Sequence, residues 1–256
     1  MRDASFAHAP AFTSVWALFL DVDGTLLDFA ERPDAVRVDR ELGDLLANLQ
    51  AACAGALALI SGRPVSEIDR LFAPLRLAVA GQHGIERRDA RGVMHHYAFG
   101  GARLQRAARA LHALVAEHPA LLLEEKESSL ALHYRQAPQL AEIAHRAALS
   151  AARGLGAGFE LIAGKLVYEL KPGGRDKGLA IDDFMTEVPF ARRVAVFVGD
   201  DTTDEFGFET VNRIGGLSVK VGPGPSVARW RLADAAAVRE WLSAYVSYTA
   251  SRASTP

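Results

Sequence analysis

Short apolar runs that end abruptly in Gly, Ser or Asp are the feature that most constrains how this chain can fold. Stretches with apolar residues at helical spacing follow most of these runs, which is typical of a parallel β-sheet covered by helices on both faces. Right-handed crossovers bring the carboxyl ends of such strands to one edge of the sheet. The predicted strands span residues 16–20, 56–60, 77–80, 194–198 and 217–221, and predicted helices span residues 41–51 and 65–72.

The middle of the chain changes character and predicts a separate α+β unit. Two segments typical of linkers, Gly100-Gly101 and Pro172-Gly173-Gly174, bracket it. The expected fold class is therefore α/β, with a Rossmann-like parallel-sheet core of residues 1–100 and 173–256 and an inserted α+β cap of residues 101–172. Within the cap the spacing predicts helices over 102–117 and 140–152 and strands over 121–125, 130–135, 159–163 and 166–170, with a turn at Gly164.

The composition limits the partners and the compartment. A hydrophobic content of 50%, a formal net charge of −2 and scattered basic residues favour a small-molecule partner over nucleic acid or an anionic membrane. Apolar runs stay well short of the roughly 18 residues of a membrane span, and residues 15–20 are too short for a signal-peptide core. Cys53 is the single cysteine, so we expect a buried thiol in a reducing compartment. We expect a cytoplasmic protein that acts as a monomer.

The segment Leu20-Asp21-Val22-Asp23-Gly24-Thr25 places two carboxylates two residues apart, where a predicted strand ends. Residues two apart share a direction on a strand, and a loop that starts there lets both side chains converge on one ligand. One carboxylate can attack phosphorus and be released again, while the second can shuttle protons. A capped turn is the alternative interpretation of an isolated Asp-x-Asp.

A second acidic cluster, Gly199-Asp200-Asp201-Thr202-Thr203-Asp204-Glu205, follows another predicted strand. Mg²⁺ prefers one or two carboxylates, several waters and a substrate phosphate oxygen. Asp200 beside Asp21 would supply that arrangement, and the metal would offset the repulsion between an anionic nucleophile and an anionic phosphate. A solvated acidic turn is the alternative.

Two further residues complete a predicted phosphate pocket. Ser61 directly follows the strand predicted over 56–60, so its hydroxyl can meet phosphate oxygens at the start of a helix. Lys177, in Gly173-Gly174-Arg175-Asp176-Lys177-Gly178, precedes a helical stretch and can neutralise the nucleophile and the transferring group. A helix N-cap for Ser61 and a solvated lysine for Lys177 are the alternatives.

These four motifs, in this order, resemble the phosphatases of the haloacid dehalogenase-like superfamily. The loop at 199–205, the segment Gly81-Gln82-His83-Gly84 and a cap of this size resemble the trehalose-6-phosphate phosphatases in particular. The resemblance implies Asp21 as nucleophile and metal ligand, and Asp23 as general acid and base whose carbonyl also meets Mg²⁺. It implies Asp200 as the other direct metal ligand, with Asp201 and Asp204 supporting the metal site and orienting Lys177. Ser61 and Lys177 would hold the phosphate.

For the sugar, the same resemblance implies charged cap residues on two strands. Glu124-Glu125-Lys126 and Val167-Tyr168-Glu169-Leu170 are similar to the family's segments, which makes Glu124, Lys126 and Glu169 substrate-binding candidates. Glu124 and Lys126 would share one strand face, where closure of the cap could bring them to sugar hydroxyls. A solvated strand face is the alternative. Arg63 and His83 match family segments at the mouth of the core, where a purely structural loop role is equally open.

Other polar or aromatic segments favour structural roles. His95-His96 on a strand would point to opposite faces, which argues against a metal pair. Two basic segments, residues 87–91 and 229–231, resemble solvated turns or edges, and helical spacing near the end predicts core packing for Trp241, Leu242, Tyr245 and Val246.

The implied reaction is hydrolysis of trehalose 6-phosphate with Mg²⁺. Three alternatives stay open: a phosphatase of another sugar phosphate such as a sucrose or mannosyl phosphate, a non-hydrolytic sugar-phosphate sensor on the same fold, and a phosphomutase. Intact Asp21, Asp23, Lys177 and Asp200 argue against the sensor.

Overall fold

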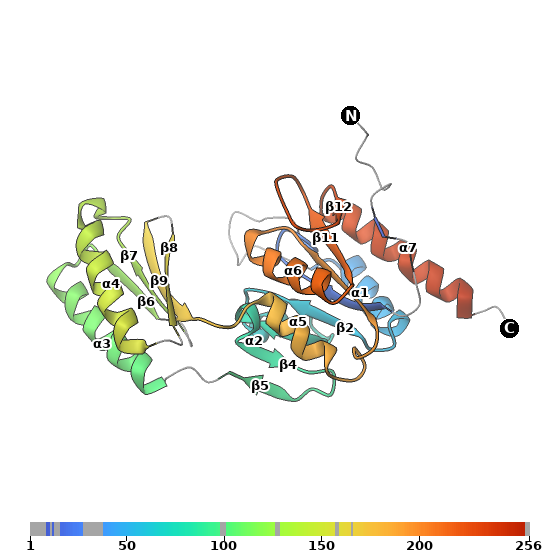
Figure 1. The fold of residues 1–256 in the computed structure, drawn as a ribbon, viewed down its shortest axis with the longest axis horizontal. Helices are drawn as coiled ribbons and strands as arrows, with labels where there is room; N and C mark the ends of the chain where they lie inside the picture. Colours follow the sequence, from blue (N-terminus) through green and yellow to red (C-terminus); the bar gives the residue numbers. More distant parts are fainter. Residues whose placement is uncertain are drawn as a thin grey trace. The chain divides into compact units, whose positions relative to one another are not determined.

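The structure, a computed structural model, divides into two compact units, one formed by residues 1–96 with 176–256 and the other by residues 97–175 (Figure 1). The first is called the core unit below, and the second the cap unit. The residues that the structure describes are 9–10, 12, 16–27, 38–97, 101–125, 129–156, 159–164 and 166–253.

The core unit contains the predicted parallel sheet, which is confirmed and is longer than expected. Its order in the described part of the chain is β12-β11-β10-β1-β2-β3-β4-β5, with the first six strands parallel and the last two antiparallel. The parallel strands are β1 (Trp16–Leu20), β2 (Leu57–Ile60), β3 (Ala78–Gly81), β10 (Val194–Gly199), β11 (Leu217–Val221) and β12 (Trp230–Leu232). The antiparallel extension is β4 (Glu86–Arg88) and β5 (Met94–His96).

Helices cover both faces of this sheet, as strand alternation shows at β1. Trp16 and Phe19 are three residues apart and so point to opposite faces. Trp16 stacks on Tyr245 of α7 at 4.6 Å, and Phe19 lies 5.9 Å from Phe184 of α5. Figure 1 shows α1 packed beside α7, and α5 beside α6. The helices of the core unit are α1 (Arg40–Ala52), α2 (Val65–Leu71), α5 (Lys177–Met185), α6 (Glu205–Arg213) and α7 (Ala235–Ala253).

Three smaller sequence predictions are confirmed here. Trp241, Leu242 and Tyr245 lie in the hydrophobic core, with Val246 packed against it. The Cys53 thiol is buried, and burial raises its pKa to about 11. The segment around Trp230 forms the edge strand β12.

The prediction that residues 87–91 form a solvated turn is wrong for its first three members. Arg87, Arg88 and Asp89 are only 3%, 3% and 2% exposed. Arg87 makes two hydrogen bonds to Glu187 at 2.7 and 3.0 Å, and Arg88 makes two to Asp69 at 2.6 Å. Because charged residues fill β4, no apolar run marked it as a strand, and its acidic partners lie far away in the sequence.

The cap unit has its own hydrophobic core between two helices and one face of an antiparallel sheet. The sheet order among described residues is β6-β7-β9-β8. Leu123, Leu132 and Tyr168 lie side by side on the face turned to the helices. The opposite face is mixed, with polar residues beside the exposed Leu122 and Ile162. The elements are α3 (Gly101–Glu117), β6 (Leu122–Glu125), β7 (Leu130–His133), α4 (Ala141–Leu155), β8 (Phe159–Gly164) and β9 (Val167–Pro172).

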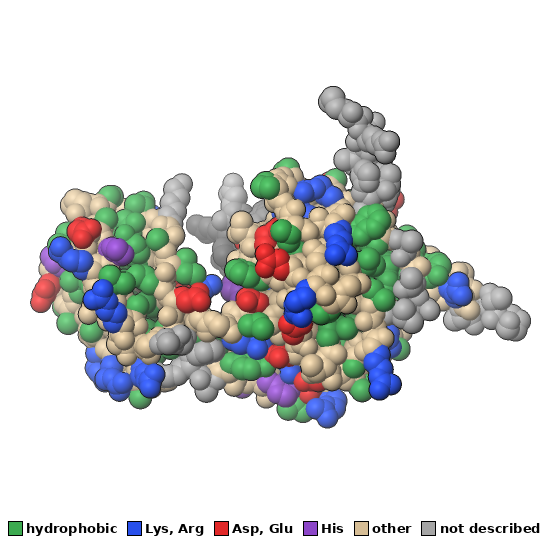
Figure 2. Space-filling model, viewed as in Figure 1, with side chains coloured by type: hydrophobic (Ala, Val, Ile, Leu, Met, Phe, Trp, Pro, Cys, Tyr) green, Lys and Arg blue, Asp and Glu red, His purple; other side chains and the backbone are tan. Residues whose placement is uncertain are grey.

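The charged surface is mixed. On the face shown in Figure 2, the Lys and Arg side chains drawn in colour lie scattered among acidic, hydrophobic and other residues. Within the described residues, no helix is long and apolar enough to cross a membrane.

The buried Arg87 ion pair supplies a test of what anchors β4 to the segment after α5. We expect Arg87→Met to lower the free energy of unfolding by about 2 kcal/mol, because Arg87 is buried while Glu187 keeps some contact with water. Denaturant unfolding would measure this. The matched control is Arg40→Met, whose exposed pair with Asp44 should contribute less than about 0.5 kcal/mol. Equal losses in the two variants would contradict a structural role for Arg87.

Candidate active site

Three adjacent strands bring the predicted catalytic loops together. In the order β10-β1-β2, Leu20 lies opposite both Val198 and Leu59. The residues that follow these strands therefore emerge side by side at one edge of the sheet, which is where α/β sheets place their ligands. Asp21 extends this pairing by donating its backbone N–H to the carbonyl of Val198 at 2.9 Å. Asp21, Ser61 and Asp200 all follow these strands.

Asp21 is buried in an ion-paired cluster. Its side chain is 6% exposed, and its Oδ1 accepts a hydrogen bond from Lys177 Nζ at 2.7 Å. Lys177, at the first position of α5 and 3% exposed, also donates to Asp204 Oδ1 at 2.6 Å. A lysine buried between two carboxylates is unlike the solvated lysine that a lone Lys-Gly pair would suggest.

Within the described part of the chain, Asp21, Asp200 and Asp204 form an acidic group with the geometry to hold a metal ion. One carboxylate oxygen from each lies within 4.8 Å of the others. Hard oxygen donors at such separations suit Mg²⁺, which is held by few carboxylates and completes its shell with other oxygens. The donor set therefore fits the predicted ion, and Asp200 keeps partial exposure toward solvent.

Asp201 and Asp23, the two predicted metal residues outside this group, have their side chains engaged elsewhere, and Asp204 has a structural role as well. Asp201 caps the short helix η4 (Thr202–Asp204) by accepting from the Thr202 N–H at 2.6 Å. Asp204 is fully buried, and its Oδ2 accepts from the backbone N–H groups of Asp200 and Asp201, both at 2.9 Å. Asp204 thus fixes the loop that presents Asp200, as well as holding Lys177. The side chain of Asp23 also points to another partner.

That partner is Arg63, which sequence reasoning placed at the mouth of the core without a contact. Arg63 donates to both carboxylate oxygens of Asp23 at 2.7 Å, and also pairs with Glu67. Such a bidentate pair holds Asp23 in one orientation. Gly24 directly after it has a φ of 81°, a left-handed conformation that favours glycine, and its N–H closes the turn onto the Leu27 carbonyl at 2.7 Å.

Ser61 and His83 belong to one tightly joined pair of loops. The Ser61 side chain, 1% exposed, accepts from the Arg63 N–H at 3.1 Å, while its carbonyl accepts from the His83 N–H at 3.0 Å. Among the described residues, none accepts a hydrogen bond from the Ser61 hydroxyl, so that hydrogen can be donated to a phosphate oxygen. The His83 ring covers Gly62, where an added Cβ would lie 2.9 Å from ring atoms.

Two residues of this site were missed by sequence reasoning. Lys220, on β11 and 6% exposed, donates to the backbone carbonyls of Asp200 and Val221, and so holds the start of the acidic loop. Thr25 is fully buried and donates to Asp200 Oδ1 at 3.3 Å. A cavity of about 250 Å³ adjoins Asp200 and Lys220. Nothing in the local sequence marks Lys220, because it looks like one polar residue in an apolar strand.

Glu124 and Glu169 lie on the face of the cap sheet turned away from its helices. Glu124 and Glu169 flank Ala131 in one row of paired residues across β6, β7 and β9. Each also has a polar neighbour: His133 Nε2 lies 3.0 Å from Glu124 Oε2, and the Ser129 hydroxyl donates to Glu169 Oε1 at 3.4 Å. Lys126 lies outside the described residues.

Burial and neighbouring charges shift the pKa values of Asp21, Asp200 and Lys177. Burial, reinforced by Asp204 and Asp200 and opposed by Lys177, raises the pKa of Asp21 to about 8. Burial and Asp204 likewise raise the pKa of Asp200 above its ordinary value. Burial alone would depress the pKa of Lys177, but Asp21 and Asp204 outweigh it and raise that pKa. Without a metal, full ionisation of Asp21 and Asp200 is therefore unfavourable in this site.

A metal-free stability series would test this unfavourable ionisation. Because the folded-state pKa of Asp21 lies above its unfolded value of 3.8, its contribution to stability is lost as pH rises toward about 8. Asparagine cannot ionise, and Lys177 keeps Asp204. We therefore expect Asp21→Asn in EDTA to melt a few degrees above the parent at pH 7, with a smaller difference at pH 5. Exposed Asp44→Asn serves as control and should show no such trend. A pH-independent difference would contradict the assignment.

Comparisons with known proteins agree with this geometry. Residues 19–236 match the family model described as trehalose-phosphatase. The chain is 44% identical over 235 residues to a trehalose-6-phosphate phosphatase of Escherichia coli strain K12, covering 92% of this chain and 88% of that one. It is also 44% identical over 212 residues to a probable trehalose-phosphate phosphatase of Sinorhizobium fredii, covering 81% and 78%.

Solved structures show the same fold. A trehalose-6-phosphate phosphatase of Aspergillus fumigatus superposes with a TM-score of 0.72 at 23% identity, covering 92% of this chain and 93% of that one. A haloacid dehalogenase-like hydrolase from B. subtilis superposes with a TM-score of 0.61 at 15% identity, covering 89% and 99%. The resemblance drawn from the sequence motifs is confirmed: the chain has the haloacid dehalogenase-like fold and belongs to the trehalose-phosphatase family of phosphoric monoester hydrolases.

Proposed function

We propose that this phosphatase hydrolyses trehalose 6-phosphate to trehalose and phosphate, using Mg²⁺ and an aspartyl-phosphate formed on Asp21. One observation carries the proposal: in a chain 44% identical to a trehalose-6-phosphate phosphatase, a buried Asp21 lies 2.7 Å from Lys177 and beside two further carboxylates. We place the enzyme in the cytoplasm, in keeping with a single, buried cysteine.

In the first step, a carboxylate oxygen of Asp21 attacks phosphorus and the bond from phosphorus to the sugar oxygen breaks. Lys177 and the Ser61 hydroxyl would bind the phosphoryl oxygens as charge shifts onto them. Asp23 gives its proton to the departing sugar oxygen. Mg²⁺ held by Asp21 and Asp200 would supply positive charge that favours ionised Asp21 and offsets its repulsion from the phosphate.

In the second step, Asp23 takes a proton from water, which attacks the phosphorus of the aspartyl-phosphate and releases phosphate from Asp21. Both oxygens of Asp23 accept hydrogen bonds from Arg63 in the structure. A proton on Asp23 removes one acceptor from this bidentate pair, so the proposed proton transfers would loosen the contact with Arg63. Arg63 would then act as a resting partner that keeps Asp23 ordered at the mouth of the site.

The cap would select the sugar. Glu124 and Glu169 present carboxylates from neighbouring strands on one face, and His133 and Ser129 hold them there. Carboxylate acceptors in a row suit the hydroxyls of a disaccharide, since each hydroxyl can donate one hydrogen bond. Closure of the cap over bound substrate would exclude bulk water during transfer.

A phosphate-release assay tests the substrate and the mechanism separately. We expect trehalose 6-phosphate to be hydrolysed faster than sucrose 6-phosphate and glucose 6-phosphate, with activity lost in EDTA and restored by Mg²⁺. Asp21→Asn should lose activity by a factor of about 10⁴ or more while remaining folded by circular dichroism, because no carboxylate is left to form the intermediate. Equal rates of hydrolysis of the three sugar phosphates would refute the proposed preference for trehalose 6-phosphate. An active Asp21→Asn variant would refute the mechanism.

Cap recognition predicts an effect on substrate binding alone. We expect Glu169→Gln to raise KM for trehalose 6-phosphate about tenfold, through weakening of a charge-assisted hydrogen bond. Its turnover of p-nitrophenyl phosphate, which has no sugar, should be unchanged. Glu142→Gln, the same substitution at an exposed position on α4, is the matched control and should leave both substrates unaffected. A parallel loss on both substrates would indicate damage to the fold and count against a role in sugar binding.

A further inference from the structure

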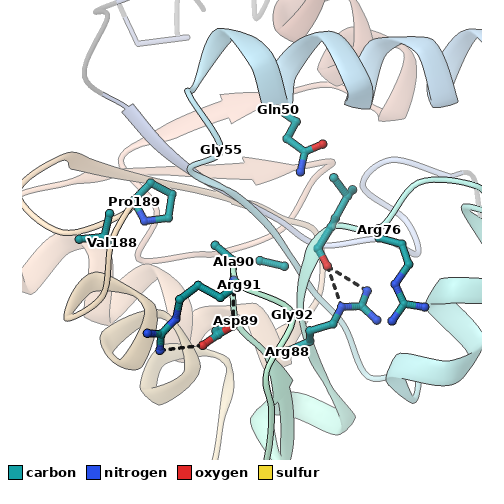
Figure 3. Close-up of a pocket in the computed structure, with 12 residues that line it drawn as sticks. Gln50, Gly55, Arg76, Arg88, Asp89, Ala90, Arg91, Gly92, Val188 and Pro189 are labelled. Carbon is teal, nitrogen blue, oxygen red and sulfur yellow. Dashed lines mark hydrogen bonds and ion pairs between the residues drawn. The ribbon is translucent and has the colours of Figure 1, made fainter.

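A cavity of about 450 Å³ opens at the edge of the core sheet opposite the catalytic carboxylates (Figure 3). Residues that line it come from the places where β2 and β3 begin, where β4 ends, and from the segment ahead of β10. The catalytic loops follow the carboxyl ends of the same parallel strands, so the length of the sheet separates the two sites. Nothing in the reaction described above uses this cavity.

Three arginines line the cavity: Arg76, Arg88 and Arg91. Arg88 is 3% exposed and is fixed by bonds to Asp69 and to the Leu77 carbonyl. The side chains of Arg76 and Arg91 are 70% and 75% exposed, so their guanidinium groups can reach a ligand from water. Arg76 lies beside Arg88, and Arg91 lies across the cavity from them, where it pairs with Asp89 (Figure 3). A fixed guanidinium group with accessible ones on either side of a cavity is a setting suited to oxyanions.

The nearby carboxylates do not neutralise all of the positive charge of these arginines. Asp69 accepts both hydrogen bonds from Arg88 and lies 3.4 Å from Arg76, so one carboxylate serves two guanidinium groups. Asp89 lies 3.2 Å from Arg91 and 3.3 Å from His95, and it also caps the turn through the backbone N–H groups of residues 91 and 93. The neighbouring Glu187 is already paired with Arg87. Three guanidinium groups therefore face two carboxylates.

The rest of the wall offers a neutral hydrogen-bonding group and an apolar surface. Figure 3 shows the Gln50 amide projecting from α1 toward the cavity, across from Val188 and Pro189. Val188 is 82% exposed, so it presents an apolar surface that is accessible from solvent. A ligand with an anionic group and an uncharged body would meet both kinds of surface.

We propose that this cavity is a binding site for a small metabolite that carries a phosphate or carboxylate group. The exposed side chains of Arg76 and Arg91 turn toward the mouth from opposite sides to bind the oxyanion, and Val188 and Pro189 contact the body of the ligand. Arg88 belongs to the fixed wall and is left out of the mutational test, because its replacement would remove both of its hydrogen bonds to Asp69 and disturb the fold.

Arginine labelling, followed residue by residue, tests the site in the intact protein. Phenylglyoxal modification is measured by mass spectrometry in EDTA, with inorganic phosphate or citrate added and sodium chloride as the reference at equal ionic strength. We expect either anion to slow modification of Arg76 and Arg91 severalfold. Arg40, whose side chain is 94% exposed and paired with Asp44, is the internal control and should react at an unchanged rate. Arg63 reports separately on anion binding at the catalytic edge.

The outcomes distinguish the ligand class. Protection of Arg76 and Arg91 by phosphate supports a phosphorylated ligand, and protection by citrate alone supports a carboxylate. Equal slowing at Arg40, or protection of Arg63 alone, overturns the proposal, since the first is general screening and the second is binding at the catalytic site.

The labelling of Arg76 in an Arg91→Gln variant tests whether both arginines bind the same anion. In Arg91→Gln, protection of Arg76 should require about tenfold more of the protecting anion, because one charge-assisted contact is lost. Arg40→Gln should leave the protecting concentration unchanged. Unaltered turnover in Arg91→Gln would show that the fold is intact. An unshifted protection curve for Arg76 would overturn the assignment of Arg91.

Discussion

The parallel pairing of β1 with β10 is the constraint on which the candidate active site depends. Because Leu20 and Val198 are register partners, Asp21 and the loop that carries Asp200 lie next to each other. The hydrogen bond from Thr25 to Asp200 joins the same two loops across a sequence separation of 175 residues. This arrangement brings several carboxylates together in a largely buried place, where their ionised forms are poorly solvated. Lys177 offsets part of this charge, and the remaining excess favours a cation at the site.

The hydrophobic core makes such an unfavourable cluster tolerable. On one face of β1, Trp16 stacks on Tyr245, and on the other Phe19 lies among Phe184 and Phe190. These contacts hold the central strands from both sides, so the loops at their ends have little freedom to move apart. Functional sites commonly carry local instability that the surrounding structure supports.

The two units divide the work that the proposed reaction needs. Each has its own hydrophobic core, one around the parallel sheet and one between α3, α4 and the antiparallel sheet. The carboxylates and Lys177 belong to the first, and the row containing Glu124 and Glu169 belongs to the second. In the proposed reaction, substrate preference could therefore change on the face of the cap sheet that carries Glu124 and Glu169 without disturbing the carboxylates and Lys177 of the core unit.

The sequence by itself determined five of the parallel strands, the first two helices of the core unit, the elements of the cap unit and the residues at the strand ends, because apolar periodicity and motif spacing are local properties that do not depend on distant partners. It thereby located Asp21, Ser61, Lys177 and Asp200. Only the tertiary structure decided the contacts, since those depend on groups brought together from distant segments. Asp23 pairs with Arg63 at a separation of 40 residues, and Arg87 pairs with Glu187 at a separation of 100. The burial of Arg87, Arg88 and Lys220 was invisible for the same reason: a charged side chain is read as solvated until its partner across the fold is known.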